Sequence, residues 1–211
     1  TQHGVYMSYD DGDHWSPLSL NLPDLPVVSL EVAGSSIAIA TMGRGFYVLD
    51  GLGPLRQFAP AMSASSNPVL FQPDTAIRSS NPARIQYWLR SPAQKLTIEI
   101  QDANGTIIQS FVSDSSTRAA AAERAEAARA GAGGGGRFSA APAAPPPVTP
   151  GLHSVTWDMR YPGVTTFPGM ILWGASTIGP VAAPGSYRVR MVADGASSTQ
   201  PLVIQRNPTY T

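Results

Sequence analysis

The sequence has no cysteine, which excludes disulfide bonds and thiolate chemistry. Charged residues make up only 13% of the 211 residues, and Lys95 is the single lysine among the 14 basic residues. Because the formal net charge is zero and the arginines are scattered, the chain has no basic stripe of the kind that nucleic acid requires. No apolar run reaches the roughly 18 residues of a transmembrane helix. The sequence therefore favours neither a nucleic-acid-binding protein nor one with a membrane-spanning helix.

Glycine and proline are abundant instead, with 20 of each, and 43% of the residues are hydrophobic. A chain of this length has room for one large or two modest domains, and its many turn formers favour an all-β fold over a helical one. The sequence begins at Thr1, without methionine and inside a strand-like run. We therefore expect a processed or partial chain.

One short stretch, residues 8–15, specifies its own local structure. It lies between a strand-like run at 4–9 and an alternating run at 16–20, which is the pattern of a β-hairpin. Asp10 can accept hydrogen bonds from backbone N–H groups of the turn, and Gly12 supplies a positive φ. The stretch therefore predicts a tight, side-chain-closed turn.

Five residues of this stretch, Ser8, Asp10, Gly12, His14 and Trp15, together resemble the Asp-box, with His14 where threonine is usual. In that family the box is a fold staple found far from active sites, so the resemblance implies a structural role for all five. Trp15 is expected to be a buried apolar plug, and Trp15→Ala should then lower the free energy of unfolding by roughly 3 to 5 kcal/mol.

The chain also contains an internal repeat. Gly-Val-Tyr-Met at 4–7 is echoed by Gly-Phe-Tyr-Val at 45–48, a spacing of 41 residues, with strand-like runs at 27–32 and 36–41 between them. A period of roughly 40 to 45 residues with four short strands is typical of a β-propeller blade. Residues 1–58 are therefore expected to hold the last two strands of one blade and one whole four-stranded blade. The remaining blades would come from preceding sequence or from another chain, and 1–58 alone should not fold.

The likeness to the Asp-box family extends along the chain. Residues 40–50, 54–57, 157–163 and 167–170 resemble the closing part of bacterial Asp-box (BNR-repeat) glycosyl-hydrolase-like proteins, which are similar to the ten-bladed propeller of sortilin, the VPS10 domain. Met42 departs from the pattern, since such proteins often have histidine there. The resemblance implies the closing blades of an Asp-box β-propeller followed by an immunoglobulin-like or fibronectin-like β-sandwich.

From residue 83 to 211 the alternation of apolar and polar residues also predicts such a sandwich. Asn104 and Gly105 favour a tight turn between two of its strands. Residues 59–82, rich in proline, serine and alanine, are expected to be a connector with one apolar anchor at 69–71. The strand-like runs of the sandwich are 84–89, 95–100, 107–112, 152–158, 186–192 and 201–204.

A low-complexity insertion, residues 115–150, interrupts these strands. Residues 119–130 are rich in alanine and favour a helix with Ser116 or Thr117 as its N-cap. A run of glycines then forms a flexible spacer, and residues 140–150 tend to polyproline conformation. We expect the insertion to be the least ordered part of the chain, with protease cleavage in its glycine- and proline-rich half.

The spacing of the polar residues predicts no reactive centre. The aspartates at 10–13 lack the ligand spacing of a calcium loop, and the three histidines have neither ligand nor catalytic spacing. A glycosidase needs two carboxyl groups about 5 to 10 Å apart across a cleft, whereas Asp50, Glu99 and Asp158 fit strand ends or the surface better. We therefore expect no catalytic, cofactor-binding or metal-binding residue in this chain.

Two features could contact a ligand or partner. Arg44, between two glycines in a turn of the expected blade, could meet an anionic group in a propeller opening or pair with a carboxylate of a neighbouring blade. The loop at 161–179 carries large apolar side chains without a strand or helix period, and such a cluster needs cover. Packing against the sandwich or propeller and docking to a partner protein both remain open. The cluster consists of Phe167, Met170, Ile171, Leu172 and Trp173.

Three functions follow as alternatives. The first is a non-catalytic structural or interaction region of a larger propeller protein, whose sandwich buttresses the propeller and offers a protein-docking surface. The second, implied by the likeness to sialidases and xyloglucanases, is a glycoside hydrolase with its active site in blades outside this sequence. The third is a sortilin-like peptide-binding propeller. The expected partners are the remaining blades and a protein, and the expected location is periplasmic or extracellular.

Overall fold

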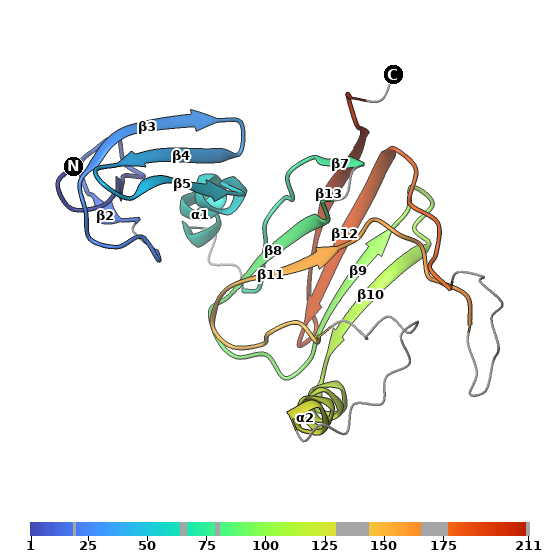
Figure 1. Cartoon of the computed structure of the whole chain (residues 1–211). Helices are drawn as coiled ribbons and strands as arrows, with labels where there is room; N and C mark the ends of the chain where they lie inside the picture. The colour runs from blue at the N-terminus through green and yellow to red at the C-terminus, as the bar shows by residue number, and fades with distance from the viewer. Residues whose placement is uncertain (19, 64–66, 79–80, 130–143, 166–176, 210–211) are drawn as a thin grey trace. The chain divides into compact units, whose positions relative to one another are not determined.

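The computed structural model describes residues 1–18, 20–63, 67–78, 81–129, 144–165 and 177–209. The chain divides into two compact units, unit 1 (Thr1–Ser65) and unit 2 (Ser66–Thr211). Both units are built mainly from β-strands (Figure 1), which confirms the all-β fold class. None of the helices within the described ranges is long and apolar enough to cross a membrane.

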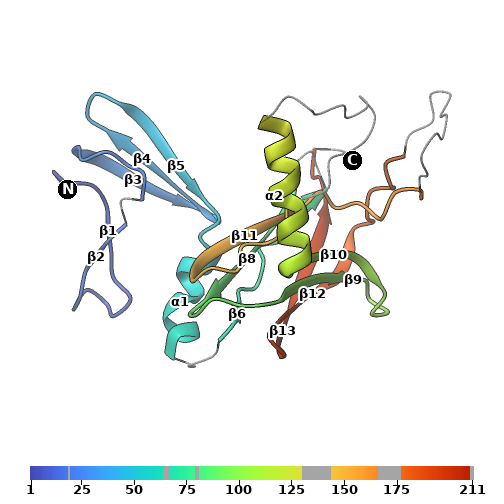
Figure 2. The same ribbon diagram turned by 90° about the horizontal axis from the view of Figure 1, so that it is seen from below.

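Unit 1 contains a short hairpin, β1–β2, and a three-stranded antiparallel sheet in the order β3–β4–β5 (Figure 2). Thr1 joins the start of the chain to β3, because its backbone exchanges two hydrogen bonds with Val27, of 3.2 and 2.9 Å. The strands are β1 (Tyr6–Met7), β2 (Ser16–Pro17), β3 (Val27–Ala33), β4 (Ser36–Thr41) and β5 (Gly45–Asp50).

Unit 1 ends in a helix, α1 (Gly53–Ser63). The backbone N–H of Leu52 donates a hydrogen bond to the Ser35 carbonyl at 2.9 Å, and the Arg56 guanidinium donates one to the Gly34 carbonyl at 2.7 Å. These bonds tie the start of the helix to the turn between β3 and β4. The whole four-stranded blade expected up to residue 58 is therefore a three-stranded sheet followed by a helix, and that helix also occupies the start of the expected connector.

Unit 2 contains a five-stranded sheet in the order β10–β9–β12–β13–β7 and a three-stranded sheet in the order β11–β8–β6. All neighbouring strands are antiparallel except β13 and β7, which are parallel. Two of the strands, β6 and β7, lie inside the range predicted as a connector, so that prediction was too wide. The strands are β6 (Val69–Leu70), β7 (Ala76–Arg78), β8 (Ala83–Leu89), β9 (Leu96–Gln101), β10 (Ile107–Ser113), β11 (Gly151–Trp157), β12 (Gly185–Ala193) and β13 (Ala196–Arg206).

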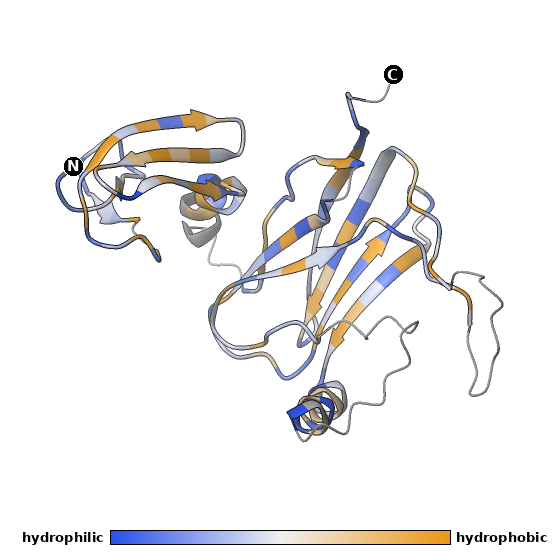
Figure 3. Ribbon diagram, in the orientation of Figure 1, coloured by the Kyte–Doolittle hydropathy of each residue, from blue (hydrophilic) through white to orange (hydrophobic). Residues whose placement is uncertain are grey.

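The two sheets of unit 2 share one hydrophobic core. Apolar and polar residues alternate along β8, β9 and β12 (Figure 3), and the apolar side chains are the buried ones. This alternation buries one face of each sheet and leaves the other to solvent. The predicted apolar anchor at 69–71 is buried as well. The largest buried side chains of the core include Ile85, Tyr87, Leu89, Leu96, Ile98, Ile100, Trp157, Met191, Leu202 and Ile204.

The insertion in unit 2 begins with a helix, α2 (Ser115–Arg129), four residues earlier than predicted. Its N-cap is Asp114, not Ser116 or Thr117. The Asp114 carboxylate accepts a hydrogen bond from the Thr117 backbone N–H at 2.9 Å, and the Thr117 hydroxyl accepts one from the Asp114 N–H at 2.8 Å. This is a reciprocal capping box. The Thr117 backbone bond is the main cause that lowers the pKa of Asp114 to about 2.

The insertion ends in residues that belong to the packed body of unit 2. The Tyr87 hydroxyl donates a hydrogen bond to the Pro147 carbonyl at 2.7 Å, and the Ala93 N–H donates one to the Val148 carbonyl at 2.9 Å. Val148 also packs against the core. The end of the predicted loose segment is therefore anchored, while residues 130–143 lie outside the described ranges.

Candidate functional site

The turn between β1 and β2 has the hydrogen bonds that its residues predict. Asp10 accepts a bond from the His14 backbone N–H at 2.9 Å, and its second oxygen lies 2.6 Å from Nδ1 of His14. The Ser8 hydroxyl accepts a bond from the Gly12 N–H at 2.9 Å and donates one to Asp10 at 2.8 Å. Gly12 has a φ of 102°. The backbone bond from His14 is the main cause that lowers the pKa of Asp10.

Trp15 differs from its prediction, because its side chain is 62% exposed. The indole lies over the backbone of Gly12, where an added Cβ would be 3.7 Å from the ring. No second layer of described residues in unit 1 encloses the ring. The predicted loss of 3 to 5 kcal/mol for Trp15→Ala requires a buried indole and is therefore wrong for this chain.

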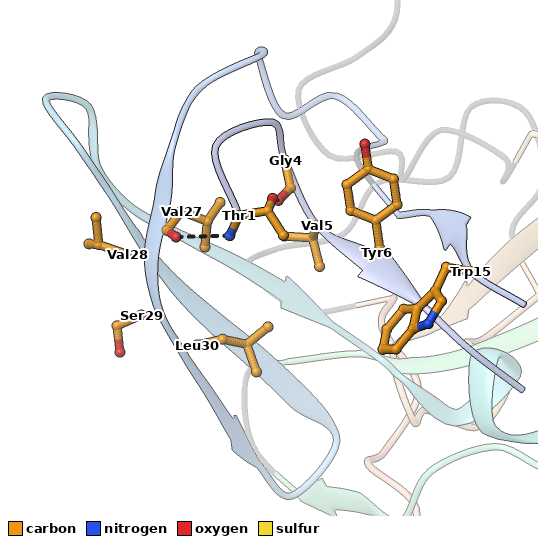
Figure 4. Close-up of a pocket in the computed structure, with 9 residues that line it drawn as sticks. All are labelled: Thr1, Gly4, Val5, Tyr6, Trp15, Val27, Val28, Ser29 and Leu30. Carbon is orange, nitrogen blue, oxygen red and sulfur yellow. Dashed lines mark hydrogen bonds between the residues drawn. The ribbon is translucent and has the colours of Figure 1, made fainter. Parts of the chain in front are cut away.

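Beside Trp15 lies an open groove of about 520 Å³ between the β1–β2 hairpin and β3. In Figure 4 the side chain of Leu30 on β3 points toward the hairpin residues. The polar groups of the lining side chains are the hydroxyl groups of Thr1, Ser29 and Tyr6 and the indole N–H of Trp15 (Figure 4). We call this cavity the hairpin groove; its apolar lining consists of Val5, Tyr6, Trp15, Val27, Val28 and Leu30.

The chemistry of the hairpin groove is that of apolar contact. Its lining side chains are apolar or carry a hydroxyl group, apart from the indole of Trp15. Its β3 wall is an outer strand of the sheet with exposed side chains at Val28, Leu30 and Val32. An exposed apolar edge strand is a template for another strand. The groove is therefore suited to bind an apolar, extended segment.

The sheet of unit 1 carries apolar side chains on both faces. The register places Ile37 and Ile39 on one face, and a small cavity of about 80 Å³ separates that face from Leu18, Leu20 and Leu22. We call the other face the Phe46 face. Register pairs Ala40 with Phe46 and Ala38 with Val48 there, and the two larger side chains are 81% and 62% exposed. The apolar side chains of the Phe46 face are Ala38, Ala40, Phe46 and Val48, and β3 adds the polar Ser29 and Glu31, which pair with Ala40 and Ala38.

The structure does not bring the other predicted site residues to the groove. Arg44 lies exposed in the turn between β4 and β5 and is not within ion-pair distance of any carboxylate among the described residues. His3 contacts Asp24 at 3.0 Å, in a separate shallow cavity. Within the described ranges no three His, Asp or Glu side chains are placed to hold a metal ion.

The predicted apolar cluster of the 161–179 loop lies outside the described residues. This holds for Phe167, Met170, Ile171, Leu172 and Trp173. The base of the loop is described: Val164 donates a backbone hydrogen bond to Thr177 at 3.2 Å, and Tyr161 donates one to Pro180 at 2.9 Å. The two arms of the loop therefore run side by side.

Sequence reasoning missed the Phe46 face, although a signal for it was present. Residues 46–49 are four consecutive apolar residues, whereas a strand with one solvated face alternates. Val27 and Val28 form a similar pair at the start of β3. Such runs are typical of strands that are covered on both sides.

Comparisons with known proteins give no family. No protein-family model matches the chain, and no curated protein matches it. Among solved structures it is similar to CopC from Methylosinus trichosporium OB3b, with 11% identity over 67% of this chain and 96% of that one and a TM-score of 0.31. It is also similar to dimeric latent PorU from Porphyromonas gingivalis, with 11% identity over 82% of this chain and 12% of that one and a TM-score of 0.33. Both TM-scores are too low to indicate a shared fold.

Proposed function

We propose that this chain is a non-catalytic interaction region of a larger β-propeller protein of the Asp-box kind. Unit 1 would be the closing part of the propeller, and unit 2 an immunoglobulin-like sandwich that buttresses it. The expected partners of unit 1 are further β-strands, supplied by the same precursor or by another chain. A periplasmic or extracellular location fits the same proposal.

The observation that carries the proposal is the Phe46 face. Phe46 is 81% exposed and Val48, on the same face, is 62% exposed, so both leave apolar area in water. A sheet with one face on the core and one in water normally has polar side chains on the face in water. In a propeller each blade is covered on both faces by its neighbours. A sheet with large exposed apolar side chains on a second face therefore fits a blade that lacks its neighbour.

Two further observations support this function. The Asp10 turn has the hydrogen bonds expected of an Asp-box. The cavities described above contain at most one carboxylate, Asp24, whereas a glycosidase site needs two. These residues thus favour binding over catalysis.

The proposal is tested by making the Phe46 face polar. Wild-type chain should bind an apolar dye such as anilinonaphthalene sulfonate and self-associate with rising concentration in sedimentation velocity. The double variant Phe46→Ser with Val48→Ser should bind much less dye and self-associate much less. Its melting temperature should not change, because exposed side chains contribute little to folding.

A matched control is Ile107→Ser with Val203→Ser, which removes two exposed apolar side chains from unit 2. This variant should keep the dye binding and the self-association of the wild type. A wild-type chain that stays monomeric and binds no dye would overturn the proposal. So would a fall in melting temperature of the Phe46 and Val48 variant as large as that of Ile39→Ala, whose side chain is buried, because the Phe46 face would then be covered internally.

A further inference from the structure

Two arginines lie side by side at the rim of unit 2. β13 and β7 are parallel, and their register pairs Arg206 with Arg78. Two residues earlier the same register pairs Ile204 with Ala76, and both of those are buried. Side chains two residues apart on a strand point to the same face, so both arginines are on the core-facing side of the sheet. They lie at its end, where the core meets solvent. Neighbouring strands are about 4.8 Å apart, so the two positive residues are close.

Among the described residues, no carboxylate forms an ion pair with either arginine. The ion pairs within the described ranges are His3–Asp24, His14–Asp10 and Arg190–Glu99, and neither rim arginine takes part. Asp102 acts on Tyr187 from nearby but forms no ion pair with either arginine; one oxygen of its carboxylate accepts the backbone N–H groups of Asn104 and Thr106, both at 2.9 Å. Like charges on neighbouring strands are unfavourable unless something compensates them.

Two tyrosines complete the rim. Tyr187 is core-facing, and its hydroxyl donates a hydrogen bond to the Ala183 carbonyl at 2.8 Å, toward the arginine end of the sheet. Burial is the main cause that raises the pKa of Tyr187; Tyr161 and Asp102 add to the rise, and the positive charge of Arg78 opposes it. Tyr161 and Arg78 therefore lie near the same phenol group.

The rim is open to solvent beside Gly185, which is exposed. Gly185 follows the core-facing alternation of β12 and pairs with Ile204, and a Cβ added to it would have no atom within 4 Å. Just before Tyr161, Met159 is buried yet has a φ of 56°, which is unfavourable for a residue with a side chain. Such backbone strain gathers at binding sites, where the surrounding structure imposes it. Here Met159 is fixed by a 2.7 Å hydrogen bond from the Ala182 N–H to its carbonyl.

We propose that Arg78, Arg206 and Tyr161 form a binding site for an oxyanion, a carboxylate or phosphate group of a ligand, on the open rim beside Gly185. A guanidinium group binds either oxyanion through two parallel N–H···O bonds, and the phenol hydroxyl donates a third. The bound charge would offset the repulsion between the arginines. This site lies entirely in unit 2 and does not depend on the function proposed for unit 1.

In the test, inorganic phosphate and, separately, acetate are titrated into the full chain at constant ionic strength. Binding is measured from two-dimensional NMR spectra of the arginine side-chain N–H groups. We expect saturable shifts with at least one of the two anions. Arg78→Gln and Arg206→Gln should each weaken that binding by about tenfold or more, since each removes a bidentate partner. Arg78→Lys, which keeps the charge but loses the fork of donors, should bind with intermediate strength.

Arg188→Gln is the matched control, because Arg188 is exposed on β12 and faces away from the core. It should bind like the wild type. Saturable binding of phosphate assigns the site to phosphate groups, and saturable binding of acetate assigns it to carboxylates. Equal weakening by Arg188→Gln would mean general charge attraction, and shifts that do not saturate with either anion would mean no site; either result overturns the proposal.

Discussion

Unit 1 and unit 2 are both β-rich, but they differ in how they bury apolar side chains. The sheets of unit 2 each have one apolar face, and these faces meet in a shared core. The sheet of unit 1 has apolar side chains on both faces, and on the second face Phe46 and Val48 are in contact with water. Because burial of apolar area is the main favourable term in folding, unit 2 is complete by itself and unit 1 has stability to gain from a partner.

The two units also differ in charge. Unit 1 has two basic and six acidic residues, a formal charge of −4, whereas unit 2 has twelve basic and eight acidic residues, a formal charge of +4. The zero net charge of the chain therefore hides two oppositely charged parts. An excess of positive charge raises the local concentration of anions, which agrees with an oxyanion site in unit 2.

The largest expected effect compares two tryptophans. Trp157 of unit 2 is 1% exposed, and its indole N–H donates a hydrogen bond to the Arg160 carbonyl at 3.0 Å. Trp157→Ala should lower the free energy of unfolding of unit 2 by about 3 to 5 kcal/mol, whereas Trp15→Ala should cost less than about 1 kcal/mol. Urea denaturation of both variants measures the difference. Equal losses would contradict the comparison between the units.

A smaller effect is expected at the anchor of the insertion. Tyr87→Phe removes the hydrogen bond to the Pro147 carbonyl and should cost about 1 to 2 kcal/mol, because the carbonyl loses its partner. Residues 144–150 should then become more sensitive to limited proteolysis. Tyr6→Phe, on an exposed tyrosine of unit 1, is the control and should change neither measurement. Unchanged cleavage in Tyr87→Phe would show that Val148 alone holds this segment.

Acid should weaken turns in both units. Hydrogen bonds from backbone N–H groups lower the pKa of Asp10 in unit 1 and of Asp114 and Asp194 in unit 2. A carboxylate whose pKa is lowered by folding stabilises the fold fully above its unfolded value of 3.8, and this contribution is lost as the pH falls through the folded value. For Asp114 the loss should extend down to about pH 2.

Circular dichroism at helix wavelengths should follow this loss in α2. Helix signal is expected to fall between about pH 4 and pH 2 in the wild type and to stay constant in Asp114→Asn, which can cap the helix but does not titrate. A wild-type signal that is constant over this range would contradict the role of the charged cap. The β1–β2 hairpin of unit 1 should lose its structure at a higher pH than α2, because no enclosed core lies beneath the hairpin.

The local features of the fold were predicted well where the chain itself determines them. The hairpin closed by Asp10 and the turn at Asn104 and Gly105 depend on residues next to each other, and Gly105 has the expected positive φ of 84°. Apolar alternation located β8, β9, β10, β11 and β12 to within a few residues. Such signals are local, so the sequence contains them in full.

Other features were missed although a local signal existed. Pro54 in the first turn of α1 is a common helix start. Asp194 and Gly195, both with positive φ, form the turn between β12 and β13 and are a strong hairpin signal.

The exposure of Trp15 could not have been predicted, because burial depends on which strands surround the ring. The oxyanion site likewise needs the register of β13 with β7, which joins residues far apart in the chain.

The smallest expected effect concerns a buried polar side chain in unit 2. The hydroxyl of Ser113, at the end of β10, is fully buried and has no hydrogen-bond partner among the described residues. A buried polar group without a partner costs more than the bond it could make, so Ser113→Ala should raise the free energy of unfolding by up to about 1 kcal/mol. Ser110→Ala on the same strand, at an exposed position, should change it by less than about 0.5 kcal/mol. Chemical denaturation of the two variants decides the matter. A loss of stability in Ser113→Ala would mean that the hydroxyl has a partner in solution. The contrast between the enclosed core of unit 2 and the exposed sheet face of unit 1 would then be sharper, because this buried hydroxyl would no longer count against the packing of unit 2.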